Sequence, residues 1–347
     1  MTDRPTTAFA DVTEAEIRAA FEAEDYVAED DIVTTVLLAL RLGKPLLVEG
    51  EPGAGKTELA KVLAARFGSE LVRLQCYEGL TAEHALYEWN YAKQLLAVQS
   101  GGAGPGGGGN AATDADLGPG PDADPRDPSV FTEEYLLERP LLRALRSDAD
   151  RPPVLLVDEI DRADDEFEAL LLEVLSDFQV SVPELGTVRA ARPPVVVVTS
   201  NRTRALSDAL KRRCLYLHVA PPSFEKETTI LERKVPELDG LVASELAAMA
   251  ARLREEPLRK PPGAAETIDW ARAVAALRDG GGGGDAGGVG ADIADSAAED
   301  GADEELSPET VRNTLGCLLK EVEDVERVDD RLLEELLAAA ERARSEA

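Results

Sequence analysis

The sequence has few aromatic residues and no long apolar run. Aromatic residues make up 4% of the 347 residues and hydrophobic residues 44%, so a core must be built mainly from Leu, Val, Ile and Ala. No apolar run reaches the roughly 18 residues that a membrane-spanning helix needs. The start, Met1-Thr-Asp-Arg-Pro, lacks the basic and apolar regions of a signal peptide. These absences predict a soluble, cytoplasmic protein with no membrane span.

Cysteine and histidine are also rare. Cys76, Cys214 and Cys317 form no Cys-x-x-Cys pair, and His84 and His218 lie far apart. A metal site built from these residue types would need them at short, regular spacing. We therefore expect buried, reduced thiols and no metal held by Cys or His.

Positive charge is scarce as well. The chain has 37 Lys and Arg against 68 Asp and Glu, which gives a formal net charge of −31, and only 9 of the 37 are lysines. Such a surface repels phosphate backbones, so nucleic acid is not expected as a partner. An acidic, lysine-poor surface is typical of proteins that work in high salt, which screens self-repulsion. A halophile-like habitat is therefore a hypothesis.

Two low-complexity segments have almost nothing to bury. Residues 101–128 read GGAGPGGGGNAATDADLGPGPDADPRDP, and residues 279–305 hold nine acids and no base. Glycine entropy and charge repulsion oppose folding in both segments. We expect tolerated surface insertions; acidic partner-binding tails are the alternative.

Strand and helix signals alternate outside these segments. Short apolar runs occupy residues 45–49, 71–75, 153–157, 195–199 and 214–219. Helical spacing of apolar residues follows the first run at Leu59, Val62 and Leu63, and the third run at Phe167, Leu171, Val174 and Phe178. This alternation predicts an α/β fold in which helices flank a parallel five-stranded sheet. Ligands of such a sheet bind outside the carboxyl ends of its strands.

Helices dominate after Pro221-Pro222. One begins at Ser307-Pro308, a capping serine followed by proline at the first helical position, and its expected apolar face consists of Val311, Leu315, Leu318, Val322 and Val325. We predict two domains: an α/β core over residues 1–221, which contains the 101–128 insert, and a helical lid over 222–347, which contains the 279–305 insert.

A phosphate-binding motif follows the first apolar run. Gly50-Glu-Pro-Gly-Ala-Gly-Lys-Thr57 matches GxxxxGK[ST] between a predicted strand and a predicted helix. Backbone N–H groups and the helix N-terminus are expected to bind phosphates there. Lys56 is expected to reach the β- and γ-phosphates, and the Thr57 hydroxyl to ligate Mg²⁺. The residues assigned to nucleotide binding in this loop are Gly50, Glu51, Pro52, Gly53, Ala54, Gly55, Lys56, Thr57 and Glu58.

An acidic pair ends the third apolar run. Asp158 at the strand end is placed to hold Mg²⁺, and Glu159 to orient and deprotonate a water molecule. An acidic start to the following helix, which carries Asp161, Asp164 and Asp165, is the alternative. The phosphate-binding motif favours the first interpretation, and the two motifs together predict an ATPase that uses ATP and Mg²⁺.

Two further polar sites follow later runs. Asn201 comes directly after the fourth run, where its amide could position water; a turn residue is the alternative. Lys211-Arg212-Arg213 precedes the fifth run and suits an arginine finger that reaches a neighbouring subunit's phosphate, or a solvated helix end.

These motifs together resemble those of a known family. GEPGAGKT, LLVDEIDRA, VVVVTSN and ALKRRC are similar to the motifs of AAA+ ATPases, and DEIDRADDEFEALLLEVLSDFQVSV resembles the MoxR group among them. RLQCYEGL, ALYEWNY and PPGAAETIDWARA resemble the CoxD-type branch. The resemblance covers about residues 24–100, 129–278 and 307–345.

The resemblance implies a ring of six subunits with ATP bound between neighbours. It also implies a partner with a von Willebrand A domain and a chaperone-like role in maturing another protein. For the CoxD-type branch that client is a molybdenum-containing carbon monoxide dehydrogenase or a similar hydroxylase.

The resemblance also implies roles for single residues. Lys56 and Thr57 match the Walker A motif, and Asp158 and Glu159 match the Walker B motif. Asn201 matches sensor 1. Arg213 matches the arginine finger, with Arg212 as the second choice. Tyr26 and Val27 match neighbours of the adenine. Many MoxR proteins open a lid helix with Ser-Pro-Arg, whose arginine is sensor 2; the comparable stretch here is Glu266-Thr-Ile-Asp-Trp-Ala-Arg272, so Arg272 is displaced by a helical turn.

Three functions remain open. The first is an ATPase that remodels a protein client. The second is a nucleotide-gated binding switch with little turnover, which would need neither Glu159 nor Asn201 nor Arg213. The third is a nucleic-acid motor or GTP-using subunit, which the negative charge disfavours.

Overall fold

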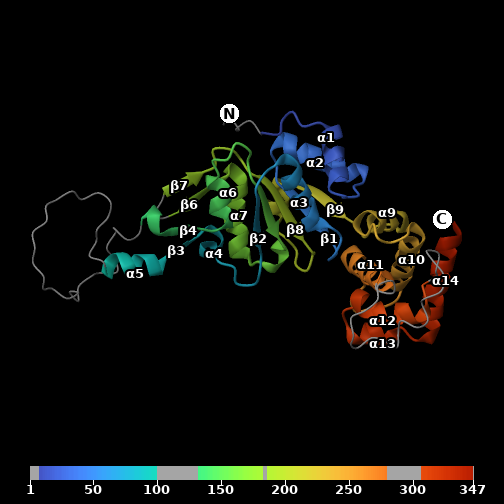
Figure 1. Ribbon diagram of the computed structural model, residues 1–347. Helices are drawn as coiled ribbons and strands as arrows, with labels where there is room; N and C mark the ends of the chain where they lie inside the picture. The colour runs from blue at the N-terminus through green and yellow to red at the C-terminus, as the bar shows by residue number, and fades with distance from the viewer. Residues whose placement is uncertain (1–7, 100–131, 183–185, 280–305, 347) are drawn as a thin grey trace, which may run out of the picture. The chain divides into compact units, whose positions relative to one another are not determined.

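The computed structural model describes residues 8–99, 132–182, 186–279 and 306–346 (Figure 1). The 101–128 segment and all but the first residue of the 279–305 segment lie outside the described residues. The chain divides into two compact units. The first unit consists of Met1–Val12, Leu38–Leu47 and Leu63–Tyr216, and the second of Thr13–Leu37, Val48–Val62 and Leu217–Ala347. The domain boundary expected after residue 221 stays a prediction.

Five strands form one parallel sheet in the order β2-β5-β8-β1-β9. They are β1 (Leu46–Gly50), β2 (Leu71–Gln75), β5 (Val154–Asp158), β8 (Val195–Ser200) and β9 (Leu215–Val219). The five strands predicted from apolar runs are confirmed, with ends that shift by a residue at most. Every residue of β1 and β5 is buried, as expected of parallel strands that are covered on both faces.

Helices α6 (Pro140–Arg146) and α7 (Asp165–Asp177) cover this sheet within the first unit (Figure 1). Leu145 of α6 and Phe167 of α7 share a buried cluster with Leu155 and Val157 of β5. The predicted apolar face of α7 is confirmed, and Phe178 ends the helix in a left-handed conformation, at φ 51°.

The first unit also contains two antiparallel strand pairs that the apolar pattern does not predict. β3 (Tyr87–Trp89) pairs with β4 (Leu136–Glu138), and β6 (Gln179–Val182) pairs with β7 (Gly186–Arg189). Short elements complete this part of the chain: α4 (Ala82–Leu86), α5 (Tyr91–Gln99), η2 (Glu133–Tyr135), η3 (Ile160–Arg162) and α8 (Asp208–Arg213).

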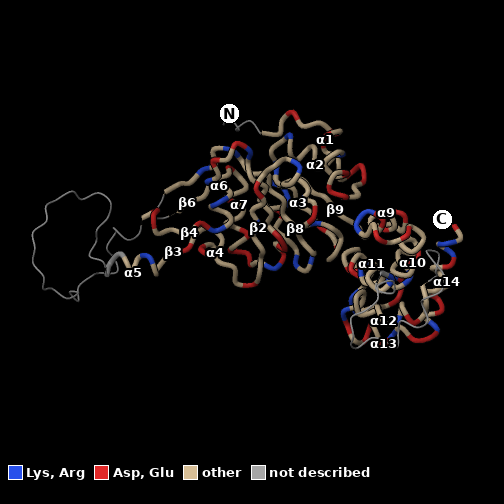
Figure 2. The backbone as a smooth tube through the Cα atoms, viewed as in Figure 1, with Lys and Arg blue, Asp and Glu red and all other residues tan. Residues whose placement is uncertain are grey.

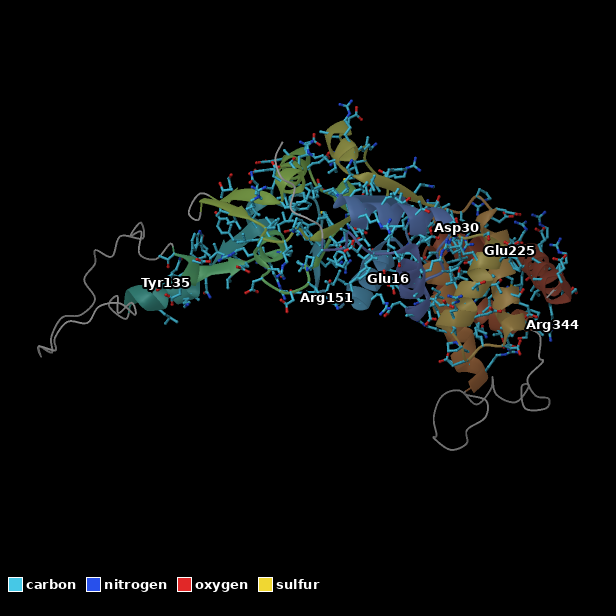
Figure 3. All side chains as sticks on the ribbon, turned by 90° about the horizontal axis from the view of Figure 1, so that it is seen from above. Glu16, Asp30, Tyr135, Arg151, Glu225 and Arg344 are labelled. Atoms are coloured by element: carbon cyan, nitrogen blue, oxygen red, sulfur yellow. The ribbon has the colours of Figure 1, made fainter. Side chains whose placement is uncertain are left out.

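The described part of the chain after Pro222 is helical, as predicted. Its helices are α9 (Phe224–Lys234), α10 (Gly240–Arg254), α11 (Ala264–Asp279), α12 (Pro308–Leu318), α13 (Val322–Arg327) and α14 (Asp330–Glu346). Trp270 of α11 is completely buried in their core and donates its indole N–H to the Thr314 hydroxyl at 2.7 Å. Arg344 of α14 (Figure 3) donates to the buried Glu245 of α10 at 2.9 Å. The N-terminal helices are α1 (Glu14–Ala23), α2 (Asp30–Leu42) and α3 (Lys56–Phe67).

The helix predicted from Ser307 begins as expected but ends early. Ser307 Oγ accepts the Thr310 N–H at 3.1 Å, which confirms the cap. The prediction that this helix continues to Val325 is wrong. Helix α12 ends at Leu318, and Val322 belongs to α13, where it is 69% exposed. Lys320 Nζ donates to carbonyls of the last turn of α12, which satisfies groups that a longer helix would have bonded.

No helix in the described ranges is long and apolar enough to cross a membrane. All three cysteines are free thiols; Cys76 and Cys214 are buried and Cys317 is partly exposed. Burial raises the pKa of Cys76 to about 12, and Asp158 adds to the effect, so this thiol stays protonated near neutral pH. Acidic residues lie along loops and helices of both units (Figure 2).

Candidate functional site

The loop between β1 and α3 has a backbone suited to bind an anion. Gly53 and Gly55 have φ of +78° and +85°, a conformation that side-chain-bearing residues rarely adopt. Helix α3 begins at Lys56, so its first N–H groups lie at this loop. The Lys56 side chain is buried against the loop, because Nζ donates to the Gly50 carbonyl at 2.9 Å and to the Glu51 carbonyl at 2.6 Å. Successive N–H groups, a helix N-terminus and a cation make this loop an anion site.

Tyr26 lies beside the phosphate loop. It stands with Val27 between α1 and α2, and its ring carbon Cε2 is 3.7 Å from the point where a Cβ on Gly55 would lie. The Tyr26 N–H donates to the Phe21 carbonyl at 2.8 Å, and the two rings pack with centroids 5.2 Å apart. Burial raises the pKa of Tyr26, with smaller effects from Glu58 and Glu29, so its hydroxyl stays protonated.

The start of α11 also meets the phosphate loop. A Cβ on Gly263 would lie 2.7 Å from the Pro52 carbonyl oxygen, so only glycine permits this approach. Glu266 Oε2 lies 2.9 Å from the Cβ position of Gly53 and accepts the Gly263 N–H at 3.1 Å. Arg272, the possible sensor 2, is instead 59% exposed and lies 3.6 Å from Asp269 on its own helix.

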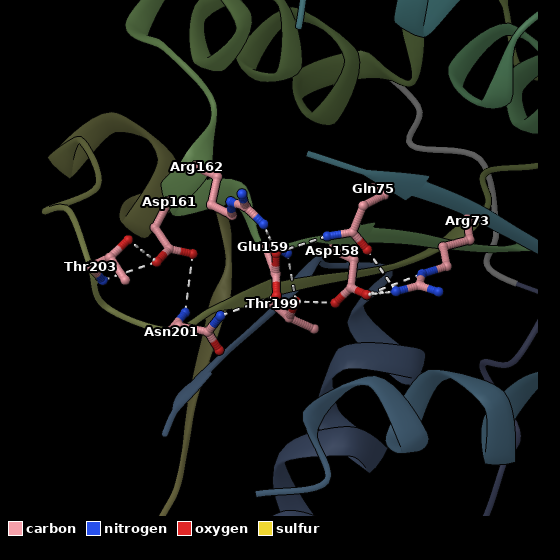
Figure 4. A network of polar contacts seen from close by, with 9 residues as sticks. All are labelled: Arg73, Gln75, Asp158, Glu159, Asp161, Arg162, Thr199, Asn201 and Thr203. Atoms are coloured by element: carbon pink, nitrogen blue, oxygen red, sulfur yellow. Dashed lines mark hydrogen bonds and ion pairs between the residues drawn. The ribbon is translucent and has the colours of Figure 1, made fainter. Parts of the chain in front are cut away.

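Asp158 ends β5 as a nearly completely buried carboxylate (Figure 4). Its Oδ1 accepts the Thr199 hydroxyl at 2.5 Å. Its Oδ2 accepts Nε of Arg73 at 3.1 Å and Nη2 at 2.6 Å. A buried carboxylate needs such charged or polar partners, and here they come from the strands on both sides of β5.

Glu159 follows in a left-handed conformation, with φ 56° and ψ 51°. This backbone is uncommon for a residue with a side chain and marks a locally strained turn. The Thr199 hydroxyl accepts the Glu159 N–H at 2.9 Å. The Glu159 carboxylate accepts hydrogen bonds from Gln75 at 2.9 Å, Arg162 at 3.0 Å and Asn201 at 3.4 Å (Figure 4). The structure thus brings Asp158, Glu159 and Asn201 together at the ends of β5 and β8.

Asp161 fixes the backbone on which Asn201 lies. Its carboxylate accepts the N–H groups of Asn201 at 3.1 Å and Thr203 at 2.9 Å, and the Thr203 hydroxyl at 2.5 Å. Burial acts to raise its pKa, but these hydrogen bonds dominate and hold the pKa of Asp161 below its usual value. The position of the Asn201 amide therefore depends on a second carboxylate of the same acid-rich stretch.

A family model described as the ATPase family associated with various cellular activities (AAA) matches residues 46–219, which is half of the chain. The chain belongs to the AAA family. The matched range begins with β1 and ends with β9, so it contains the phosphate loop, the acidic pair and Asn201.

Solved structures similar to this AAA protein include RuvB from Thermotoga maritima. A RuvB point mutant is 16% identical, with 80% of this chain and 67% of that chain covered and a TM-score of 0.40. RuvB described as a Holliday junction branch migration motor is also 16% identical, with 80% and 66% covered and a TM-score of 0.38. Similarity this low carries no information about function. No curated protein matches the sequence.

The cationic cluster of this AAA protein forms the last turn of α8. Ser207 caps the helix by accepting the Leu210 N–H at 3.2 Å. Lys211, Arg212 and Arg213 are exposed at the opposite end, where cations stabilise the negative end of the helix dipole. Arg213 also donates to the Ser176 hydroxyl at 2.8 Å and to the Ala209 carbonyl at 3.2 Å.

The sequence motifs give no site role to Arg73, Gln75, Thr199, Asp161 or Glu266, which the structure places against Asp158, Glu159, Asn201 or the phosphate loop. The β2 sequence LVRLQ contains a usable signal: Arg73 and Gln75 are two residues apart in a strand whose other positions are apolar, so they share one face. The register of β2 against β5, which places Gln75 opposite Asp158, cannot be predicted from this pattern.

Proposed function

We propose that this AAA protein binds Mg-ATP on the phosphate loop and hydrolyses it with the acidic pair. The observation that carries the proposal is the direct contact between Glu159 and Asn201 at the ends of β5 and β8, strands of the same sheet whose β1 leads into the phosphate loop. A carboxylate beside an amide is the pair that an attacking water requires: an acceptor for its proton and a group that orients it.

Each residue has a defined task in this proposal. Lys56 contacts the β- and γ-phosphates, and the Thr57 hydroxyl and the Asp158 carboxylate are the hard oxygen donors that Mg²⁺ prefers. Mg²⁺ neutralises charge on the phosphates when it is bound. Glu159 accepts the proton of the attacking water while Asn201 orients it. Tyr26, which lies beside Gly55, and Val27 are the proposed neighbours of the adenine.

Substitutions at Lys56 and Glu159 test these roles. Lys56→Ala should abolish binding of a fluorescent ATP analogue, because it removes the cation that contacts the phosphates. Glu159→Gln should retain binding and reduce phosphate release at least about a hundredfold, since an amide cannot accept the proton. Glu166→Gln, an exposed acid in the first turn of α7, is the matched control and should behave as wild type.

Equal loss of nucleotide affinity in both variants would contradict this division of roles. A wild-type protein that binds ATP and releases no phosphate would instead be a nucleotide-gated switch.

We further propose that the protein is a MoxR-type chaperone of the CoxD-like branch, with a core over residues 1–221 and a lid over 222–347. It would form a hexameric ring, bind a partner with a von Willebrand A domain and act in maturing a metalloenzyme such as a molybdenum hydroxylase. The stretch DEIDRADDEFEALLLEVLSDFQVSV supports the MoxR part of this proposal by its resemblance to that group, and RLQCYEGL, ALYEWNY and PPGAAETIDWARA support the CoxD-like branch by theirs. The net charge of −31 is unfavourable for a nucleic-acid motor.

Capture of a client tests the chaperone role. The Glu159→Gln protein loaded with ATP should retain a metalloenzyme subunit and a von Willebrand A partner from an extract of the source cells, because it cannot complete the cycle that releases them. The Lys56→Ala protein is the control and should retain neither. Stimulation of phosphate release by DNA or RNA, without any retained protein, would contradict this role.

A further inference from the structure

Arg73 is a cation inside the acidic network of the first unit (Figure 4). In β2, Val72 and Leu74 are buried on one face, whereas Arg73 and Gln75 share the other. The parallel register places Arg73 opposite Leu156 and Gln75 opposite Asp158. The guanidinium therefore reaches diagonally along the neighbouring strand to the Asp158 carboxylate.

The contact between Arg73 and Asp158 is a close, charge-assisted pair. Two guanidinium nitrogens converge on the single oxygen Oδ2, at 2.6 and 3.1 Å. The Asp158 side chain is 4% exposed and the Arg73 side chain 52%, so the carboxylate is buried while its counter-ion remains accessible to water. A buried carboxylate is costly without a compensating cation. Arg73 supplies positive charge at the position where Asp158 is proposed to hold Mg²⁺.

The same guanidinium is linked to Glu159. Arg73 Nη2 donates to Gln75 Oε1 at 2.6 Å, and Gln75 Nε2 donates to Glu159 Oε2 at 2.9 Å. Because a guanidinium can only donate, Arg73 holds the amide oxygen of Gln75 on its own side. The amide nitrogen of Gln75 is then left to face Glu159. Both carboxylates of the acidic pair are therefore connected to one cation.

We propose that Arg73 is a positioning residue that makes divalent-cation binding at Asp158 conditional on nucleotide. The guanidinium neutralises the carboxylate and repels a free cation. The phosphates of a bound nucleotide add the negative charge that outweighs this repulsion, so metal and nucleotide bind together. This inference rests on the proposed function, in which Asp158 holds Mg²⁺ with ATP.

Manganese binding, measured by electron paramagnetic resonance at physiological ionic strength, tests the inference with and without a non-hydrolysable ATP analogue. Arg73→Gln and Arg73→Met should each bind Mn²⁺ without nucleotide about three- to tenfold more tightly than wild type, since a unit charge close to the metal is removed. Arg73→Lys keeps the charge and should stay within about twofold of wild type. Arg143→Gln is the charge-matched control, because it removes a cation that pairs with the exposed Glu70 of the same unit.

With a formal net charge of −31 the protein can attract Mn²⁺ at other acidic positions, so a gain that comes from Asp158 must disappear in the double variant Arg73→Gln/Asp158→Asn. The inference about Arg73 would be overturned if both neutral Arg73 variants bound Mn²⁺ with wild-type affinity. It would also be overturned if the gain persisted in the double variant. Neither result would contradict the proposed function. A wild-type protein that binds the ATP analogue neither with Mn²⁺ nor without it would overturn the proposed function and this inference together.

Discussion

Glu266 places a carboxylate against the phosphate loop from the first turn of α11. Its side chain is 18% exposed, and Lys260 Nζ forms an ion pair with Oε1 at 3.7 Å. Because Oε2 lies 2.9 Å from the Cβ position of Gly53, a polyphosphate bound on the loop as proposed would approach a negative charge. The negative charge of Glu266 is therefore expected to affect the affinity for a nucleotide.

Replacing Glu266 with glutamine should raise affinity for ATP about three- to tenfold, since charges roughly 4 Å apart interact by about 1 kcal/mol even in water. The glutamine oxygen can still accept the Gly263 N–H, so the fold should be unaffected. Titration of a fluorescent ATP analogue without Mg²⁺ measures the change. Asp269→Asn, an exposed acid on the same helix, is the control. Unchanged or weaker affinity in Glu266→Gln would show that its carboxylate does not oppose the phosphates.

The conformation and position of a site residue could be predicted from the sequence where a short motif determines them. The positive φ of Gly53 and Gly55 follows from the glycine-rich motif, and the strand-end position of Asp158 follows from the apolar run before it. Arg73 and Glu266 could not be predicted in this way. Their contacts depend on strand register and on the approach of a distant helix, which no short pattern of residues encodes.

At the scale of elements, the sheet was predictable because its strands are buried. Runs such as residues 154–157 are apolar on both faces and short, which distinguishes them from amphipathic helices. The β6–β7 pair was missed because its strands are four residues long and hold only two valines (β6) and one valine (β7), so they do not stand out from loop sequence.

The break between α12 and α13 shows why helix ends are harder to predict. Apolar residues at helical spacing continue from Val311 to Val325, yet the chain becomes extended at Leu319. Asp324 of α13 is almost completely buried and accepts the N–H groups of Arg259 and Lys260 at 2.8 and 3.0 Å. This tertiary contact orients α13 independently of α12. The spacing of apolar residues along the sequence does not reveal such a contact.

At the scale of the whole molecule, a ring of the proposed kind would build each active site from residues of two neighbouring chains. Glu159 belongs to the network at the ends of β5 and β8, whereas Arg213 lies exposed at the end of α8. Within its own chain Arg213 bonds neutral groups, the Ser176 hydroxyl and the Ala209 carbonyl, and no ion pair of Arg213 occurs among the described residues. Neutral partners of an exposed guanidinium are readily exchanged for a phosphate, which forms stronger, charge-assisted hydrogen bonds.

Mixing two inactive variants tests whether this arginine acts on a neighbouring subunit. An arginine finger contributes about 10³–10⁵ in rate, or roughly 4–7 kcal/mol of barrier, so Glu159→Gln and Arg213→Ala should each release almost no phosphate alone. In mixed rings some interfaces join an intact Glu159 to an intact Arg213, and phosphate release should return in proportion to them. Arg212→Ala, tested in the same way, decides between the adjacent arginines, because only the finger should be complemented. If subunits that demonstrably exchange regain no activity in either mixture, the arginine acts within its own chain or only stabilises α8.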